Sequence, residues 1–196
     1  MTSEGGGAVI ADVPAVLHQL KIALDTGRVP DVPVPEGLRI TRTRNEPGPL
    51  NDCVRTFGKW AVIASEKLQG ALAKAGVDNI HWYPLTIDDV IAQQQFAYWC
   101  GNIIGVVDCI DETRTVKDDV GQIRRLWIEP RAAKGLKLFR LYEYEEVHIL
   151  VRRDVKIALE NSGCTGLKFV PANGFCDLAA EPMQDDLEAD DFVPWC

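Results

Sequence analysis

The sequence lacks any apolar run of the ~18 to 20 residues that a membrane-spanning helix needs. Its first residues also lack the basic region and the uninterrupted apolar core of a secretory signal, because Glu4 comes early and Asp12 interrupts the apolar stretch. The 196 residues are 46% hydrophobic, which is typical of a globular protein. We therefore expect a cytoplasmic protein that has no membrane partner.

The signatures of nucleotide, metal and disulfide sites are missing as well. Gly5, Gly6 and Gly7 do not follow a strand, and they lack the spacing and the lysine of phosphate loops. The six cysteines contain no C-x-x-C pair: Cys53, Cys100, Cys109, Cys164, Cys176 and Cys196. We expect reduced and mostly buried thiols, with no disulfide framework, no zinc site and no cofactor.

Basic residues are absent from the C-terminal end, where acidic residues gather. The acidic tail (residues 176–196) contains no Lys or Arg and seven carboxylates: Asp177, Glu181, Asp185, Asp186, Glu188, Asp190 and Asp191. Removing these seven from the 29 acidic residues of the chain leaves 22 against 21 Lys and Arg. The net charge of −8 is thus a C-terminal feature, and without a concentrated basic surface we expect no nucleic-acid partner.

The length fits a single domain with three parts. Residues 1–50 predict an N-terminal helix, capped at Asp12 and ended at Gly27, followed by an arm that is extended because of Pro30, Pro33 and Pro35. Residues 51–175 form the body, and residues 176–196 form the acidic tail.

The body alternates short apolar runs with turn signals, which predicts an α+β fold with a mainly antiparallel sheet and few helices. Strands are predicted at WAVIAS from Trp60, FAYWC from Phe96, IIGVVDCI from Ile103, IRRLWIE from Ile123 and KLFRL from Lys137. A short helix is predicted from Ile87 to Gln94, capped near Thr86, with Asp88 and Asp89 at its positive end.

Residues 60–84 and 147–171 share a strand, helix, strand pattern. The first unit reads WAVIAS, EKLQGALAKAG, NIHWYP, and the second reads HILVR, RDVKIALENSG, GLKFVP. Gly76 aligns with Gly163 and Pro84 with Pro171, so the helix and strand ends fall in register. Any such unit has this pattern by physics alone, but the register of the ends favours an internal duplication.

Two groups of side chains are candidates for chemistry. Asp108, Asp111 and Glu112 form D-C-I-D-E at a strand end, where carboxylates either bind a hard cation or cap the amides of a turn. The capping role is favoured. The histidines are spread along the chain without ligand spacing, so structural roles are expected for all three: His18, His81 and His148. No catalytic or metal-binding residue is therefore predicted.

The acidic tail permits two interpretations. Its carboxylates surround large apolar residues, including Phe192 and Trp195, which suits a surface that docks a basic partner. Alternatively it is a solvated tail, or one whose aromatic end packs back on the body.

Several segments carry a resemblance to a known family. They are IIGVVDCIDETRT with Asp108 and Asp111, IRRLWIE, KLFRL with Phe139, and DVKIALENSGCTGLKFVP with Gly166 and Phe169. Over about residues 96–171 the chain resembles immunity protein family eleven of bacterial polymorphic toxin systems. The resemblance implies a small cytoplasmic protein without enzymatic activity, which acts in bacterial competition by binding and neutralising a toxin encoded beside it.

The acidic balance suits a basic toxin. Two alternatives stay open from the sequence. One is a metal-assisted enzyme that uses Asp108, Asp111 and Glu112, and the other is a scaffold module that docks through its acidic tail.

Overall fold

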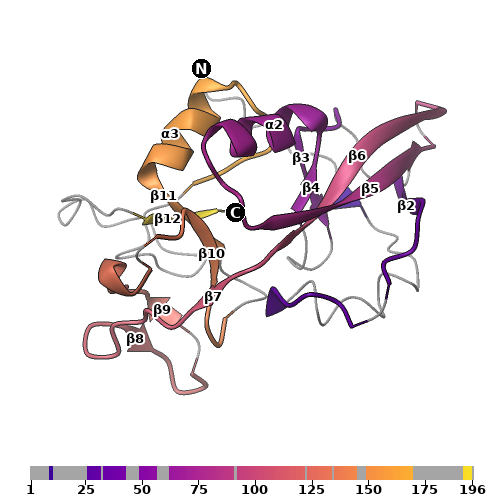
Figure 1. The fold of residues 1–196 in the computed structure, drawn as a ribbon. Helices are drawn as coiled ribbons and strands as arrows, with labels where there is room; N and C mark the ends of the chain where they lie inside the picture. Colours follow the sequence, from indigo (N-terminus) through magenta and orange to yellow (C-terminus); the bar gives the residue numbers. More distant parts are fainter. Residues whose placement is uncertain are drawn as a thin grey trace.

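The structure is a computed structural model, and it describes residues 9–10, 26–31, 33–42, 49–56, 62–90, 92–121, 123–133, 135–144, 149–169 and 192–195. Two α-helices and mainly antiparallel sheets make up this part of the chain, which confirms the α+β class (Figure 1). Neither α-helix has the length and apolar character to cross a bilayer. The predicted helix after Asp12 and most of the acidic tail lie outside the described residues.

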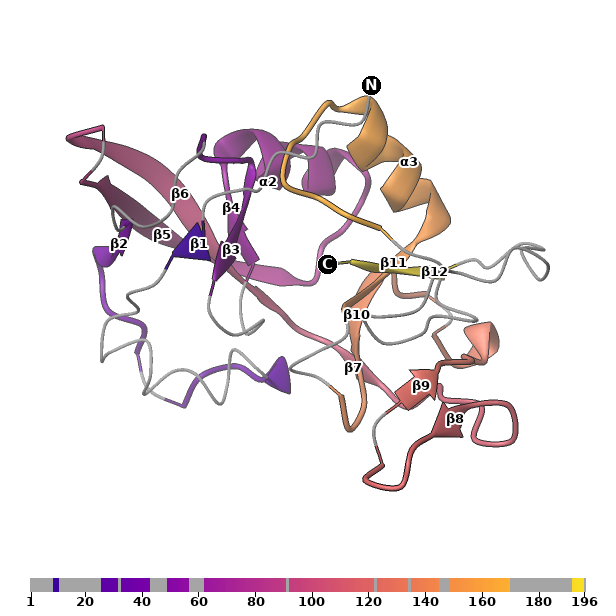
Figure 2. The same ribbon diagram turned by 180° about the vertical axis from the view of Figure 1, so that it is seen from behind.

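The larger sheet has six strands in the order β1, β3, β4, β6, β5, β2. Their bounds are β1 Val9–Ile10, β2 Leu38–Arg42, β3 Cys53–Thr56, β4 Val62–Ala64, β5 Ile80–Asp89 and β6 Gln94–Ile103. The sheet is strongly curved, and its two end strands contact each other (Figure 2). Alternate residues of its strands fill the concave side, among them Ile40, Ile63 and Ile87.

The predicted helix from Ile87 to Gln94 is wrong, because these residues continue a long β-hairpin. β5 runs to Asp89, a turn follows, and β6 begins at Gln94. Leu85, Ile87 and Asp89 are buried in alternation, which is the period of a strand. Asp88 and Asp89 do not cap a helix but bind Arg39 and Arg42 of the parallel neighbour β2.

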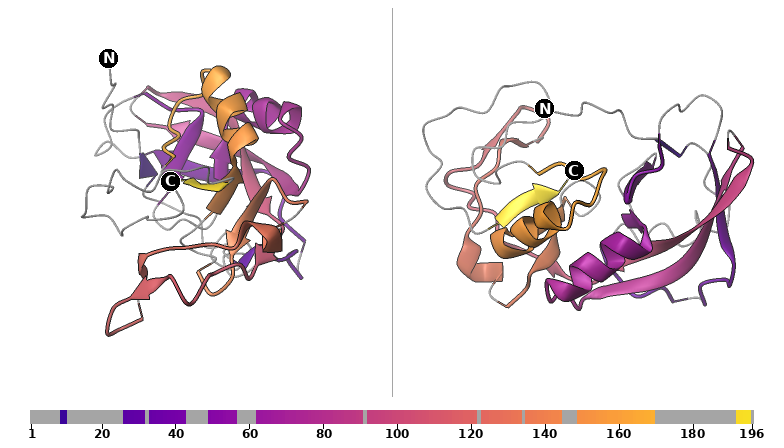
Figure 3. Two further views of the ribbon diagram at one scale, coloured as in Figure 1. Left: turned by 90° about the vertical axis from the view of Figure 1, so that its left-hand side faces the viewer. Right: turned by 90° about the horizontal axis from the view of Figure 1, so that it is seen from above.

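The helices α2 (Glu66–Lys74) and α3 (Arg153–Asn161) lie side by side on one side of the molecule, where α2 packs on the larger sheet and α3 on the second sheet (Figure 3). Ser65 caps α2, where its Oγ accepts a hydrogen bond from the Leu68 amide at 3.2 Å. Gly76 adopts a φ of +77° after α2, and Gly163 a φ of +64° after α3, so the predicted glycine stops are confirmed. Leu68, Leu72, Val155 and Leu159 turn inward into one apolar cluster.

The second sheet has the order β12, β11, β10, β7. Its strands are β7 Val106–Val107, β10 Leu138–Leu141, β11 Ile149–Arg152 and β12 Phe192–Trp195. A separate hairpin of β8 (Val116–Lys117) and β9 (Ile123–Arg125) and a 3-10 helix, η1 (Pro130–Ala133), follow β7 in the chain. This hairpin lies at one end of the molecule (Figure 1).

The two units of the proposed duplication agree in their first halves only. Each has a buried strand that leads into a nine-residue helix, β4 with α2 and β11 with α3. The described residues of the predicted second strand GLKFVP form no strand, because residues 166–168 are irregular and Phe169 makes a single bridge, while residues 170–171 lie outside the described part. Gly166 has a φ of +80°, which is incompatible with an extended strand. The duplication itself stays a prediction.

Candidate partner-binding surfaces

The junction of Asp108, Asp111 and Glu112 places its three carboxylates in different local contacts. Asp111 Oδ1 accepts hydrogen bonds from the Thr113 amide at 3.0 Å and from the Arg114 amide at 3.3 Å. Glu112 binds Lys117 at 3.0 Å, and Asp108 is exposed. Asp111 therefore has the capping role that the sequence favours. Within the part of the chain that the structure describes, no group of three or more His, Cys, Asp or Glu has the arrangement of a metal site.

Charge on Asp111 is stabilised by its own turn. The hydrogen bond from the Thr113 hydroxyl, at 2.6 Å, is the main reason why the pKa of Asp111 lies below its ordinary value of 3.8. The two amide hydrogen bonds and the nearby Arg114 act in the same direction. A carboxylate held in the ionised form by a turn is suited to fix that turn.

This turn packs directly against the segment that contains Trp127. The Asp111 amide donates to the Trp127 carbonyl at 2.9 Å, and the Glu129 amide donates to the Cys109 carbonyl at 2.7 Å. Thr115 Oγ1 donates to the Trp127 carbonyl and accepts from the Trp127 amide, at 3.1 and 3.0 Å. Two of the family-like segments, DCIDETRT and IRRLWIE, thus form one unit.

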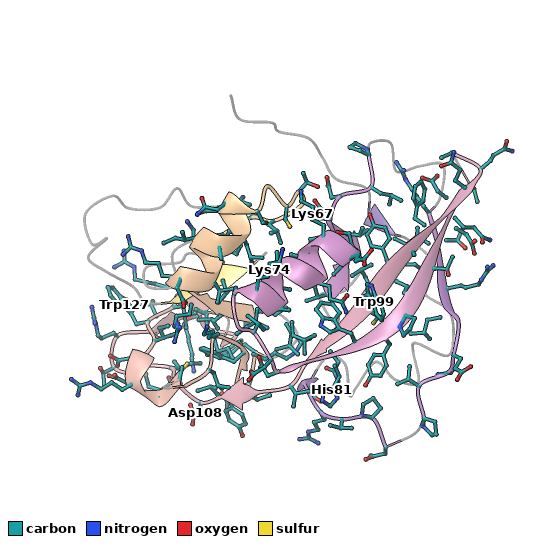
Figure 4. All side chains as sticks on the ribbon, turned by 45° about the horizontal axis from the view of Figure 1, so that its top comes forward. Lys67, Lys74, His81, Trp99, Asp108 and Trp127 are labelled. Carbon is teal, nitrogen blue, oxygen red and sulfur yellow. The ribbon has the colours of Figure 1, made fainter. Side chains whose placement is uncertain are left out.

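The result of this packing is a stacked pair, Arg114 and Trp127. The Arg114 guanidinium carbon lies 3.6 Å from the centroid of the Trp127 ring. Leu126 and Ile128 are buried on the inner side of their segment, whereas Trp127 is half-buried and Arg114 is exposed. Figure 4 shows Trp127 and Asp108 at the end of the molecule away from Lys67. Arginine and tryptophan are the residues most enriched among binding hot spots.

Large apolar side chains are also exposed at this end. Val116 and Val120 of the β8–β9 hairpin are 51% and 79% exposed, and Tyr142 after β10 is 49% exposed. Two ion pairs lie in the same hairpin, Lys117 with Glu112 at 3.0 Å and Arg124 with Asp118 at 2.8 Å. The tyrosine Tyr144 fastens the hairpin to the body, because its hydroxyl donates to the Gly121 carbonyl at 3.2 Å.

The other family-like residues have structural positions. Phe139 is fully buried in the cluster that supports the hairpin and η1. Phe169 is half-buried, with the Lys156 ammonium 5.9 Å from the centroid of its ring. Gly166 lies against the segment before β3, where a side chain would overlap the Cys53 carbonyl. These residues do not join Asp108 and Asp111 in a common site.

A half-buried network around Asp52 connects the loop that contains Gly166 to the start of α2. Asp52 accepts hydrogen bonds from Ser65 Oγ at 2.7 Å and from the Thr165 amide at 2.9 Å, and it lies 3.5 Å from Lys67 Nζ. Burial raises the pKa of Asp52, but these donors outweigh burial, and the net pKa lies below 3.8. Local sequence patterns do not indicate this role of Asp52, because its partners lie 13 and 113 positions away.

Most of the predicted partner-binding residues cannot be placed. The seven carboxylates of the acidic tail lie outside the described residues, whereas Phe192 and Trp195 lie in β12. β12 pairs with β11 in antiparallel register, with Phe192 opposite Arg152 and Trp195 opposite Ile149. The backbone at the end of the tail therefore returns to the body, as one of the two interpretations of the tail requires.

The four cysteines of the described region are free thiols, of which Cys100 and Cys109 are buried. Burial raises the pKa of Cys100 to about 12, and burial with the nearby Asp108 raises that of Cys109 to about 11, so neither is reactive at neutral pH. Cys53 and Cys164 are half-buried. His81 is exposed on β5, apart from Asp108 (Figure 4). His18 and His148 lie outside the described residues.

Comparison with known proteins adds one finding. The model of a family described as an immunity protein family (Imm11) matches residues 4–174, which is most of the chain. The matched range contains the Asp111 turn, the stacked pair and the Asp52 network, and it ends before the acidic carboxylates. No curated protein gives a significant match.

Proposed function

The chain belongs to the Imm11 immunity protein family, and from this premise we propose that it neutralises a cognate toxin by binding it directly. The family match over residues 4–174 is the observation that carries the proposal. Neutralisation by direct binding requires a stable surface and does not require a catalytic residue. We propose that the protein acts in the cytoplasm, beside the site where its toxin is made or delivered.

We propose the acidic tail as the part that first attracts the toxin. Its seven carboxylates follow Phe169 and precede β12, and both of these contact the body. The acidic tail is therefore joined to the described body at both ends. Complementary charge raises association rates more than it raises affinity, so the tail suits a toxin with a basic surface.

The first experiment asks whether a complex forms. The product of the reading frame immediately upstream is tagged and co-expressed with the untagged chain, and the tag is used for purification. We expect the chain to co-purify in a fixed stoichiometry and the complex to survive gel filtration. An upstream product that is recovered without the chain, under conditions where both are folded, would contradict the proposal.

The second experiment isolates the charge of the acidic tail. A variant with Asp185, Asp186, Asp190 and Asp191 changed to Asn is compared with a control of the same net charge. The control changes exposed acids of the body to their amides: Asp31, Glu36, Asp78 and Glu160. At low salt we expect the tail variant to associate about 10-fold more slowly than the control, and at high salt we expect the difference to shrink. Equal rates at low salt would remove the tail from the mechanism.

Substitution is preferable to deletion in this test. A deletion after Cys176 removes β12 together with the carboxylates, and it leaves β11 as an unprotected sheet edge. Loss of binding would then report the damage to the sheet as readily as the loss of charge.

A further inference from the structure

The stacked pair of Arg114 and Trp127 has the geometry of a binding hot spot that still lacks its partner. The guanidinium carbon lies 3.6 Å above the ring centroid, and the arginine is exposed. Stacking fixes the plane of the guanidinium and leaves its donor edges directed to the side, toward solvent. A side chain held in this way loses little further entropy when it binds.

The acids nearest to Arg114 in the sequence are already engaged. Asp111 accepts the hydrogen bonds of its own turn, and Glu112 is paired with Lys117. Across the hairpin, Asp118 is paired with Arg124. Among the described residues, no carboxylate forms an ion pair with Arg114. Asp111 is an anion that Arg114 influences, since the guanidinium helps to lower the pKa of that carboxyl, but Asp111 is held by the hydrogen bonds of its own turn. The five donors of Arg114 therefore have an aromatic face beneath them and no carboxylate that binds them directly.

The support under the pair is rigid. Thr115 makes two hydrogen bonds to the backbone of Trp127, and Asp111 fixes the turn that ends in Arg114. Leu126 is fully buried beside Trp127 and holds the segment against the body. Shielding the Trp127 ring from water does not require this arrangement, because an aliphatic side chain on an unconstrained turn would cover the ring equally well.

We propose that Arg114, stacked on Trp127, binds a carboxylate side chain at the centre of the interface with the toxin. This inference rests on the proposed function, since the occupant is the toxin. Val116, two residues after Arg114, and Val120 in the same β8–β9 hairpin expose apolar area that can join the charged contact in one interface. We therefore expect the contact between this surface and the toxin to be apolar with one buried ion pair. The acidic tail is expected to act separately, through long-range electrostatic attraction.

Dissociation of the purified complex tests the inference. The tagged upstream product is immobilised with each variant of the chain bound, and an excess of labelled wild-type chain is added to replace the variant as it leaves. Arg114→Gln removes the charge and keeps a planar group over the ring, whereas Arg114→Lys keeps the charge and loses the fork of donors. Arg124→Gln is the matched control, because Arg124 is exposed on the same hairpin and already paired.

We expect Arg114→Gln to dissociate about 30-fold faster than wild type, Arg114→Lys to be intermediate, and Arg124→Gln to stay within about threefold. All three variants should have the unfolding temperature of the wild-type chain. A faster dissociation of Arg114→Gln then reports a loss of binding and not a loss of stability. Equal dissociation of Arg114→Gln and Arg124→Gln overturns the inference and leaves the proposed function intact. Failure of the wild-type chain to form the complex contradicts both.

Discussion

Gly166 is a residue at which two constraints exclude any side chain. Its φ is +80°, and a Cβ atom would overlap the Cys53 carbonyl and stand 2.6 Å from Asn51 Cβ. We expect Gly166→Ala to lower the free energy of unfolding by about 2–4 kcal/mol, from backbone strain and steric overlap together. Gly37→Ala is the control, because Gly37 has a φ of +72° but nothing within 4 Å of its added Cβ. Equal losses in urea unfolding would show that the close approach is unimportant.

The lowered pKa of Asp52 makes the free energy of unfolding depend on pH. Its folded pKa lies below the ordinary 3.8, so its contribution is complete above that value and is lost as the pH falls through the folded pKa. We expect Asp52→Asn to cost about 1–3 kcal/mol at pH 7, since charge-assisted hydrogen bonds are lost. The difference from wild type should shrink below about pH 4. A difference that is constant from pH 7 to acid would contradict the assignment, and chemical unfolding at several pH values measures it.

Among individual residues, the sequence predicted those whose roles are local. Asp111 caps a turn three residues long, and Gly76 ends a helix in its own segment, so both could be inferred from neighbouring residues. Asp52 and Thr165 could not, because the contact joins residues 113 positions apart. The pair of Arg114 and Trp127 was missed for the same reason, although each residue lies in a segment that the family resemblance singles out.

The β5–β6 hairpin depends on an ion pair that is removed from water. Arg42 Nη1 lies 2.7 Å from Asp89 Oδ2, with side chains 6% and 2% exposed. Asp89 also accepts a hydrogen bond from the Ala92 amide in the turn at 3.0 Å. The pair therefore joins β2, β5 and the turn of the hairpin.

Removing one partner of this pair should be costly. We expect Asp89→Ala to lower the free energy of unfolding by about 3–5 kcal/mol, because the buried Arg42 loses the carboxylate it faces. Asp88→Ala serves as control, since its pair with Arg39 is 3.3 Å long and more exposed, and such pairs contribute about 0–1 kcal/mol. Denaturant unfolding of the two variants should separate them clearly, and equal small losses would contradict a structural role for the pair.

At the level of elements, the predictions were correct where the spacing of apolar residues indicated one type of element only. The stretch from Ile87 to Gln94 contains both a possible cap and a strand alternation, and the pairing of Ile87 with Ile40 on β2 selects the strand. The helices α2 and α3 have glycine stops and apolar spacing that agree, so both were predicted within a residue or two. Long-range strand pairing is the information that a local pattern does not contain.

For the whole molecule, β12 has a protective role at the edge of the second sheet. The four residues Phe192–Trp195 pair with all of β11, whose first three residues are buried. Deleting residues 192–196 should expose this edge, cost on the order of 2 kcal/mol, and promote self-association. Gel filtration with light scattering and amide exchange of Ile149 to Arg152 measure both effects. A deletion variant that stays monomeric and equally stable would show that β12 protects nothing.

These contacts separate the parts of the molecule that maintain the fold from the parts that we propose to bind the toxin. The two sheets and the helices packed on them form a scaffold, the Arg114–Trp127 pair lies at one end of it, and the acidic tail is a separate segment of the sequence. The sequence identified the family, the α+β class and the acidic tail. The stacked pair of Arg114 and Trp127 could be identified only from the structure, because tertiary packing brings its two segments together.

Survival of cells tests the central claim most directly. The upstream reading frame is induced in a host that carries either this chain, the Arg114→Gln variant or an empty vector, and viable cells are counted. We expect death with the empty vector, full survival with the wild-type chain, and reduced survival with Arg114→Gln at limiting expression. Death of cells that express the folded wild-type chain at high level would contradict the account.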